Sequence, residues 1–129
     1  MSFAYDPANI FARILRGELP CDKVLETEHS LAFRDIAPQA PDHVLVIPKG
    51  AYVCYDDFAR DASDAEIADF TRAVGEVCRM LGVALSDGGR GYRLIANTGG
   101  DGMQEVPHLH VHVMSGRRLG SMLVNPDPA

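Results

Sequence analysis

Three of the chain's five histidines stand at alternate positions, His108, His110 and His112, in the stretch PHLHVHVM. Apolar residues separate them, and this alternation predicts a strand with the three histidines on one face. Polar strand faces are normally filled by Thr, Lys, Glu or Ser, so three titratable rings need another explanation. Metal binding, nucleophilic catalysis and simple polar decoration are the three alternatives.

Metal binding suits two of these histidines better than all three. Successive members of the series lie about 6.6 Å apart along a strand and the outer pair about 13 Å apart, whereas a Zn–N bond is only about 2.0–2.1 Å long. Gly102, His108 and His110 have the spacing that begins a cupin metal motif, but VHVMSG follows where that motif needs a glutamate. We therefore do not expect one metal ion bound by all three histidines, and we assign no metal ligands.

Catalysis uses the histidines differently. One imidazole nitrogen can attack an electrophilic phosphorus while the other is held by a hydrogen bond. Neighbouring rings can donate hydrogen bonds to phosphate oxygens or protonate a leaving group, and crowding keeps some of them neutral at pH 7. The preceding GGDGMQE, residues 99–105, is either an anion cradle of backbone N–H groups or a plain flexible turn.

Length and composition exclude several classes of protein. The 129 residues suit one domain, the net charge is −6 and no Lys/Arg-rich block occurs, which argues against a nucleic-acid surface. The apolar runs are too short for a membrane span, and no secretory signal is evident at the N-terminus. Three cysteines without a C-x-x-C pair argue against a disulfide framework and fit a reducing cytoplasm.

Hydrophobic periodicity and turn residues predict the elements that must position the histidines. The long helix has a capping box at Ser63 and Glu66, and Pro107 should mark the beginning of the last strand. Since strands and helices do not alternate throughout, we expect an α+β fold with a mainly antiparallel sheet. In chain order we expect a helix within 6–20, two strands around a turn at 28–30, a strand over 43–48, a helix over 63–81, and strands over 91–98 and 106–115.

The triad and its flanking segments resemble the Hint branch of the histidine triad (HIT) family. Three segments have the order and spacing of that branch: IFARILRGELP, LAFRDIAPQAPDHVLVIPK and NTGGDGMQEVPHLHVHVMSGRRLG. Together they run from about residue 9 to 120, and the C-terminal tail is taken as 116–129. The resemblance implies a single HIT domain over 1–129. It also implies a HIT-like fold with a five-stranded antiparallel meander, one long and one short helix, and a homodimer.

The resemblance also implies hydrolysis of purine nucleoside 5′-phosphoramidates, conjugates of AMP or GMP, through a nucleotidyl-histidine intermediate and without a cofactor. His110 would attack the phosphorus, and His112 would contact the phosphate and assist proton transfer to the leaving group. His108 and His43 would support them, whereas His29 matches no family site and is expected to be a surface turn residue.

The resemblance carries a nucleotide site as well. An aromatic and an aliphatic side chain would sandwich the base, and a carboxylate would accept hydrogen bonds from the ribose hydroxyls. Four apolar residues would complete the wall of the site, although a role in the ordinary core is equally expected for them: Ile10, Phe11, Ile14 and Leu19. The implied nucleotide-binding residues are Phe33, Asp35, Ile36, Asn97, Met103, Gln104, Glu105, Ile10, Phe11, Ile14 and Leu19.

Three residues depart from the branch pattern. Met103 stands where glycine is common, Pro107 replaces an aromatic residue, and Glu105 replaces the serine of eukaryotic members, as in bacterial-looking ones. An acidic side chain at 105 would suit a cationic leaving amine. Three other functions stay open: a dinucleoside polyphosphate hydrolase of the Fhit type, a nucleotide- or partner-binding module with little turnover, and a metalloprotein.

Overall fold

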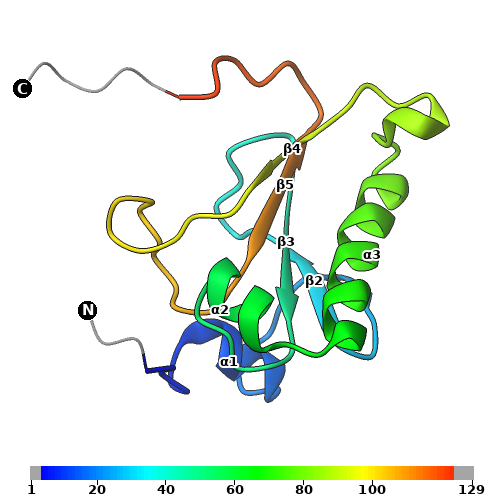
Figure 1. The fold of residues 1–129 in the computed structure, drawn as a ribbon. Helices are drawn as coiled ribbons and strands as arrows, with labels where there is room; N and C mark the ends of the chain where they lie inside the picture. Colours follow the sequence, from blue (N-terminus) through cyan, green and yellow to red (C-terminus); the bar gives the residue numbers. More distant parts are fainter. Residues whose placement is uncertain (1–3, 124–129) are drawn as a thin grey trace, which may run out of the picture.

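The computed structural model describes residues 4–123. Its centre is one antiparallel sheet of five strands in the order β1-β2-β3-β5-β4 (Figure 1). The five-stranded antiparallel sheet was predicted, but only its first three strands form a simple meander. The strand bounds are β1 Lys23–Glu26, β2 Ser30–Arg34, β3 Asp42–Pro48, β4 Arg93–Ile95 and β5 Val111–Ser115.

The departure from a meander lies at β3, the longest strand of the sheet. It pairs with β2 along one edge and with β5 along the other. Because β5 occupies that second edge, β4 pairs only with β5 and ends the sheet. This order aligns His43 in β3 with Met114 in β5, and Leu45 with His112, so two histidines far apart in sequence come to neighbouring strands.

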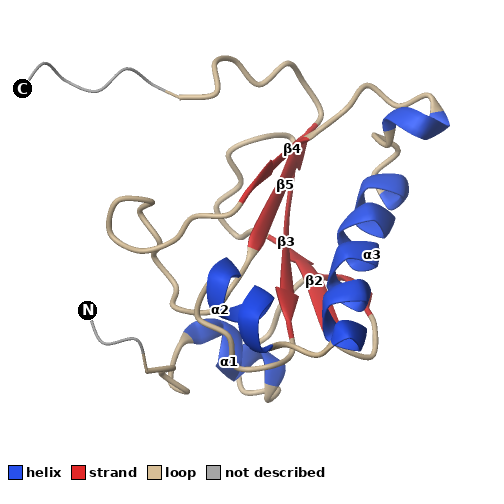
Figure 2. Ribbon diagram, in the orientation of Figure 1, coloured by secondary structure: helices blue, strands red, loops and turns tan. Residues whose placement is uncertain are grey.

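Within residues 4–123, three α-helices accompany the sheet: α1 Ile10–Leu15, α2 Tyr55–Asp61 and α3 Asp64–Met80, with a short 3-10 helix, η1, at Leu85–Asp87 (Figure 2). The long helix α3 and its Ser63–Glu66 capping box are confirmed. The expectation of only two helices is wrong, because α2 was missed. Its N-cap is Cys54, an unusual capping residue, and the carboxylate of Asp57 accepts the backbone N–H groups of Val53 and Cys54.

The two faces of the sheet are covered differently. On the face under α3, a large apolar cluster includes Val44, Val46 and Val113 from the strands and Val77 from the helix. On the opposite face, β3 contributes its alternate side chains to a smaller cluster, formed by Phe11, Leu31, Phe33, Leu45 and Ile47. Since both faces bury β3, this strand is a rigid base for His43.

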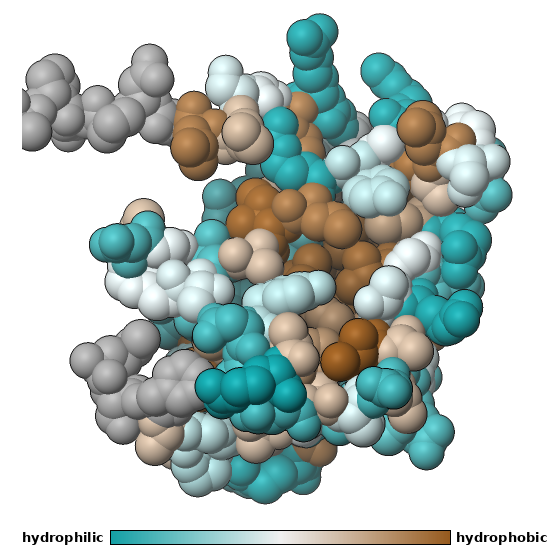
Figure 3. Space-filling model, viewed as in Figure 1, coloured by the Kyte–Doolittle hydropathy of each residue, from teal (hydrophilic) through white to brown (hydrophobic). Residues whose placement is uncertain are grey.

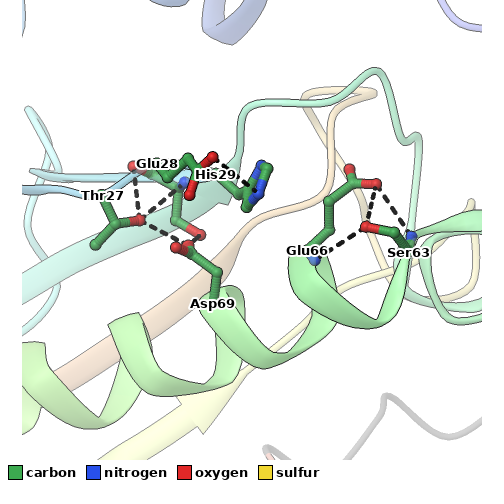
Figure 4. Close-up of polar contacts among 7 residues, drawn as sticks. Thr27, Glu28, His29, Ser63, Glu66 and Asp69 are labelled. Carbon is green, nitrogen blue, oxygen red and sulfur yellow. Dashed lines mark hydrogen bonds and ion pairs between the residues drawn. The ribbon is translucent and has the colours of Figure 1, made fainter.

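Polar contacts tie the turn between β1 and β2 to α3 (Figure 4). Asp69 of α3 accepts hydrogen bonds from the hydroxyls of Thr27 at 2.6 Å and Ser30 at 2.7 Å. His29 lies in the same turn, where its side chain is partly exposed and 3.9 Å from Glu28. This histidine is a turn residue, as expected. No helix within residues 4–123 is long and apolar enough to cross a membrane.

Candidate active site

The strand β5 begins only at Val111, so His112 lies in the strand, while His108 and His110 lie in the segment before it. The expected strand over 106–115 is therefore too long. The backbone N–H of His108 donates to the carbonyl of Val106 at 2.8 Å and closes a three-residue turn around Pro107. Proline suits the centre of such a turn, because its φ is fixed and its missing N–H is not needed there.

His108 is fully buried, with 0% of the residue exposed. Its Nε2 lies 2.8 Å from the carbonyl oxygen of Pro48, and its Nδ1 lies 2.6 Å from the hydroxyl of Tyr5. A carbonyl can only accept, so Nε2 carries the proton and Nδ1 accepts from the tyrosine. Burial is the main cause that lowers the pKa of His108 to about 4, and the ring is neutral at pH 7.

His110 is held by the backbone of the residue two positions before it. Its Nδ1 lies 2.8 Å from the carbonyl oxygen of His108, so Nδ1 donates and Nε2 keeps its lone pair. The residue is only 6% exposed, and burial lowers the pKa of its ring. Phe11 packs edge-on against the imidazole, with ring centroids 5.0 Å apart. The result is a neutral imidazole fixed in one tautomer, as a nitrogen nucleophile requires.

His43 and His112 form a second pair, joined ring to ring. The backbone N–H of Gln39 donates to Nδ1 of His43 at 3.1 Å, so a neutral His43 carries its proton on Nε2. That nitrogen lies 2.8 Å from Nδ1 of His112. His112 therefore accepts through Nδ1 and carries its own proton on Nε2. Burial is the first cause, and the neighbouring rings of His110 and His43 the next, that lower the pKa of His112 to about 4.

The same two rings and the carboxylate of Asp35 form a group whose ligand atoms all lie within 4.8 Å of one another, within residues 4–123. Asp35 Oδ2 is 3.4 Å from His43 Nε2. A metal would need a lone pair at that nitrogen, yet the neutral ring has only one in-plane lone pair, and it is at Nδ1, where it accepts from the N–H of Gln39. His43 could bind a metal there only as an imidazolate. The donor set suits a hydrogen-bonded pair better than a metal centre.

His110 and His112 open onto a cleft of about 700 Å³, a size within the usual range of small-molecule sites. Their ring centroids are 5.0 Å apart. His108 and His43 lie behind them and do not line the cleft. Nine of the expected nucleotide-binding residues do line it: Ile10, Phe11, Ile14, Phe33, Asp35, Ile36, Asn97, Met103 and Glu105.

Several apolar residues that line this cleft are open to solvent, among them Ile36 and Met103. Ile36 is 99% exposed and Met103 is 77% exposed. Beside Ile36, Asp35 accepts the backbone N–H of Ala37 at 2.8 Å through one oxygen, and its other oxygen is turned toward His43. The cleft thus offers free apolar surface next to a carboxylate, as a nucleoside needs.

Leu19 and Gln104, which were expected at the nucleotide site, do not line the cleft; Pro20 and Cys21 take the place expected for Leu19. Gln104 braces the glycine-rich loop instead. Its side-chain amide donates to the carbonyls of Val53 at 2.7 Å and Val106 at 3.1 Å, and its side-chain oxygen accepts the N–H of Gly99. A long amide can satisfy backbone groups as well as a ligand, and the sequence did not separate these roles.

The glycine-rich loop is also less open to an anion than expected. The N–H groups of Gly102, Met103 and Gln104 all donate to carbonyls within 97–104, so they are not free to cradle a phosphate. A Cβ on Gly102 would lie 2.4 Å from the carbonyl oxygen of Thr98, so only glycine fits this fold of the loop. Met103 adopts a φ of 57°, a conformation usually left to glycine or asparagine. The loop is best described as a wall of the cleft.

Three groups that hold the histidines were missed from the sequence: the hydroxyl of Tyr5, the N–H of Gln39 and the carbonyl of Pro48. Two of them are backbone groups, which every residue type supplies. No pattern of side chains could have revealed them.

This fold, with paired histidines at the edge of a nucleotide-sized cleft, defines a histidine triad protein. The HIT domain family matches residues 16–119, and the chain belongs to that family.

Curated relatives agree along nearly the whole chain. It is 64% identical over 123 residues to an uncharacterised 13.2 kDa HIT-like protein of Azospirillum brasilense, covering 95% of this chain and 98% of that one. It is 39% identical over 116 residues to the purine nucleoside phosphoramidase of Escherichia coli K12, covering 90% and 93%.

Solved structures give the same fold. A histidine triad protein from Clostridium difficile superposes with a TM-score of 0.77 at 34% identity, covering 93% of this chain and 100% of that one. A HIT family hydrolase from Legionella pneumophila gives 0.76 at 36% identity, covering 87% and 96%. The expected HIT-like fold is confirmed.

Proposed function

We propose that this protein hydrolyses purine nucleoside 5′-phosphoramidates through a nucleotidyl-histidine intermediate on His110. One observation carries the proposal: His110 donates through Nδ1 to a carbonyl and so presents the lone pair of Nε2, in a residue that lines the cleft. The phosphoramidase of Escherichia coli, at 39% identity, supports the choice of substrate class.

The reaction follows from these tautomers. Nε2 of His110 attacks the phosphorus and forms an N–P bond while the bond from phosphorus to the leaving amine breaks. The departing nitrogen takes the electron pair and a proton from water in the open cleft. The imidazole becomes cationic, and the bond from Nδ1–H to the carbonyl of His108 strengthens with that charge. The hydroxide left by that water then attacks the phosphorus, the N–P bond breaks with its electron pair returning to Nε2 of His110, and the nucleoside monophosphate is released.

His112 acts here as a hydrogen-bond donor to a non-bridging phosphoryl oxygen. It was expected also to assist proton transfer, but the geometry argues against that part. With a pKa of about 4, the ring is not an imidazolium at pH 7. Giving up the proton on Nε2 would require a replacement from His43, whose other nitrogen faces a backbone N–H that cannot supply one. A fixed donor aimed at developing charge fits this arrangement.

The base would lie between Phe33 and Ile36, and the ribose hydroxyls would donate to Asp35. The free surface of Ile36 and the carboxylate beside it support this placement. An acidic protein can bind a nucleotide in this way, because the carboxylate contacts hydroxyls rather than phosphate. Asn97 and Met103, which also line the cleft, complete the proposed site.

Glu105 would lie near the leaving amine. It lines the cleft together with His110, and its charge favours a cationic departing group. Substituting Glu105→Gln should lower the preference for a lysine-like amine over a neutral aromatic amine. An unchanged ratio of kcat/KM for the two leaving groups would remove Glu105 from this role.

The function is tested with an adenosine 5′-phosphoramidate that carries a fluorogenic amine, assayed in EDTA. Chelator-resistant release that disappears in His110→Ala supports the proposal. Turnover that EDTA removes and zinc restores would favour a metal mechanism, and binding of AMP without turnover of any phosphoramidate would favour a binding module. Faster cleavage of dinucleoside polyphosphates would favour the Fhit-type activity.

We also propose that two copies of the chain pair as a homodimer. Figure 3 shows hydrophobic side chains gathered in the middle of one face, between β4 and α3. Leu94 of the edge strand β4 and Met80 at the end of α3 are about half exposed. Light scattering at micromolar concentration should give twice the mass of the chain, and Leu94→Glu should reduce it. A monomer in the unmodified protein would refute the pairing.

A further inference from the structure

We infer that Tyr5, a residue outside the cleft, is a positioning residue for the nucleophile, acting through His108. This inference rests on the proposed function, because it assigns the attack to His110. Tyr5 does not line the cleft, but its hydroxyl lies 2.6 Å from Nδ1 of His108 across 103 positions of sequence.

The hydroxyl satisfies the one ring nitrogen that the rest of the fold leaves open. Nε2 of His108 must donate to the carbonyl of Pro48, so Nδ1 of the neutral ring can only accept. The residue is fully buried, and within residues 4–123 Tyr5 is the only hydrogen-bond partner of that nitrogen. A buried acceptor left without a donor is unfavourable, so without the hydroxyl the ring is driven to move.

A movement of His108 reaches the nucleophile directly. The carbonyl of His108 is the acceptor for Nδ1–H of His110, so the same residue holds Tyr5 with its ring and His110 with its backbone. The N–H of Leu109 lies in the same peptide plane as this carbonyl and donates to the carbonyl of Tyr52 at 2.8 Å, so this peptide is held from both sides. Displacing the ring of His108 pulls on that peptide through its own Cα and strains the hydrogen bond that fixes the tautomer and direction of His110.

The segment that carries Tyr5 is itself held in place. Arg16 donates to the carbonyl of Pro7 at 2.7 Å, and the side-chain amide of Asn9 donates to the carbonyl of Asp6 at 2.8 Å. Asn9 then caps α1 by accepting the N–H of Ala12. The tyrosine ring also packs edge-on against His108, with centroids 5.6 Å apart. The hydroxyl is thus presented by an ordered segment.

Tyr5→Phe removes the hydroxyl and keeps the ring contact. Tyr55→Phe is the matched control, since Tyr55 is half exposed and its hydroxyl has no hydrogen-bond partner within residues 4–123. We expect kcat of Tyr5→Phe to fall about tenfold, the size typical of losing a group that orients a functional side chain. KM should change less than about twofold by the same reasoning, because Tyr5 does not line the cleft. The control should keep both constants.

Nitrogen-15 NMR of the ring nitrogens gives a readout that needs no turnover. In Tyr5→Phe the Nδ1 signal of His108 should move as it loses its donor, and the Nδ1–H signal of His110 should shift or broaden. A fall in kcat with an unchanged His110 signal would overturn the inference, as would unchanged kcat. A fall in kcat that matches the loss of folded protein would also overturn it.

The two proposals can fail separately. If the unmodified protein cleaves no phosphoramidate, the proposed function fails, while a changed His110 signal would still show that Tyr5 positions this ring. If the unmodified protein is active and Tyr5→Phe matches it in kcat and in both signals, only the positioning inference fails.

Discussion

The site contains two pairs of histidines that are joined in different ways. His108 and His110 are joined through a backbone carbonyl, and their rings do not share a hydrogen bond. His43 and His112 are joined ring to ring at 2.8 Å. In each pair one member faces the cleft, and the other is buried behind it. The member behind the cleft determines the tautomer of the member that lines it.

The difference lies in which nitrogen faces the substrate. The carbonyl of His108 accepts from His110, so His110 presents a lone pair to the cleft. His43 donates to His112, so His112 presents an N–H to the cleft. Under the proposed function, two identical side chains, with centroids 5.0 Å apart, would thus act as a nucleophile and a donor. Their roles follow from the polarity of the group behind them.

The largest expected effect comes from removing the nucleophile. His110→Ala should lower kcat on the order of 10⁴-fold or more, as when a covalent nucleophile is lost. AMP binding, measured by calorimetry, should change little, because the base and ribose contacts remain. Residual activity within tenfold of the unmodified protein would show that the two pairs are not divided into nucleophile and donor.

The next largest effect should come from the donor. His112→Gln removes the ring and should lower kcat by about 10²–10³-fold, the loss typical of one oxyanion donor. Mass spectrometry after mixing with substrate should still detect a nucleotidyl group on His110, formed slowly. Failure to form any such adduct, with AMP still bound, would mean that His112 does more than stabilise charge.

The sequence predicted the parts of this site that depend on residue type. Hydrophobic periodicity predicted the long helix α3, the spacing of Ser63 and Glu66 predicted its capping box, and the alternation of the histidines predicted the strand that carries His112. Periodicity misplaced the beginning of β5, because the alternation of histidines and apolar residues already begins at residues 108–110, which pair with no strand. The hydrogen bond across Pro107 decided that boundary.

The sequence could not predict which nitrogen of His110 and of His112 carries the proton, and so which ring presents a lone pair and which presents an N–H to the cleft. This difference depends on the carbonyls of His108 and Pro48 and on the N–H of Gln39, which are backbone groups. Their directions are set by tertiary structure and not by residue type. Tyr5 was missed for a related reason, since a tyrosine 103 positions away carries no signal of contact.

A third prediction concerns the pH dependence of the free energy of unfolding, to which the buried histidine His108 contributes. An unfolded histidine has a pKa near 6.5, whereas burial lowers the pKa of His108 to about 4. Between these values the unfolded chain binds a proton that the folded chain does not. The stability from this residue is complete above about pH 6.5 and is lost as pH falls toward 4, by roughly 3 kcal/mol. His112, with its pKa also about 4, adds in the same direction.

Urea unfolding at pH 7, 6, 5 and 4 measures this loss. His108→Phe should be less stable at pH 7, since it leaves the carbonyl of Pro48 and the hydroxyl of Tyr5 without their hydrogen-bond partner. Its stability should nevertheless fall less steeply below pH 6.5. An acid slope equal to that of the unmodified protein would mean that other groups govern the loss.

The smallest effect is expected from the partner that only orients. His43→Phe keeps the ring volume in β3 but removes the donor to Nδ1 of His112, which is then free to carry its proton on either nitrogen. Because the ring of His112 would then exchange between two tautomers and be held less firmly, kcat should fall about tenfold. This loss is smaller than the loss expected for His112→Gln, and KM should be nearly unchanged. Nitrogen-15 NMR should show mixed protonation at His112. If His43→Phe were as inactive as His112→Gln, the two rings would act as one proton-transferring unit, and the fixed-donor role of His112 would have to be abandoned.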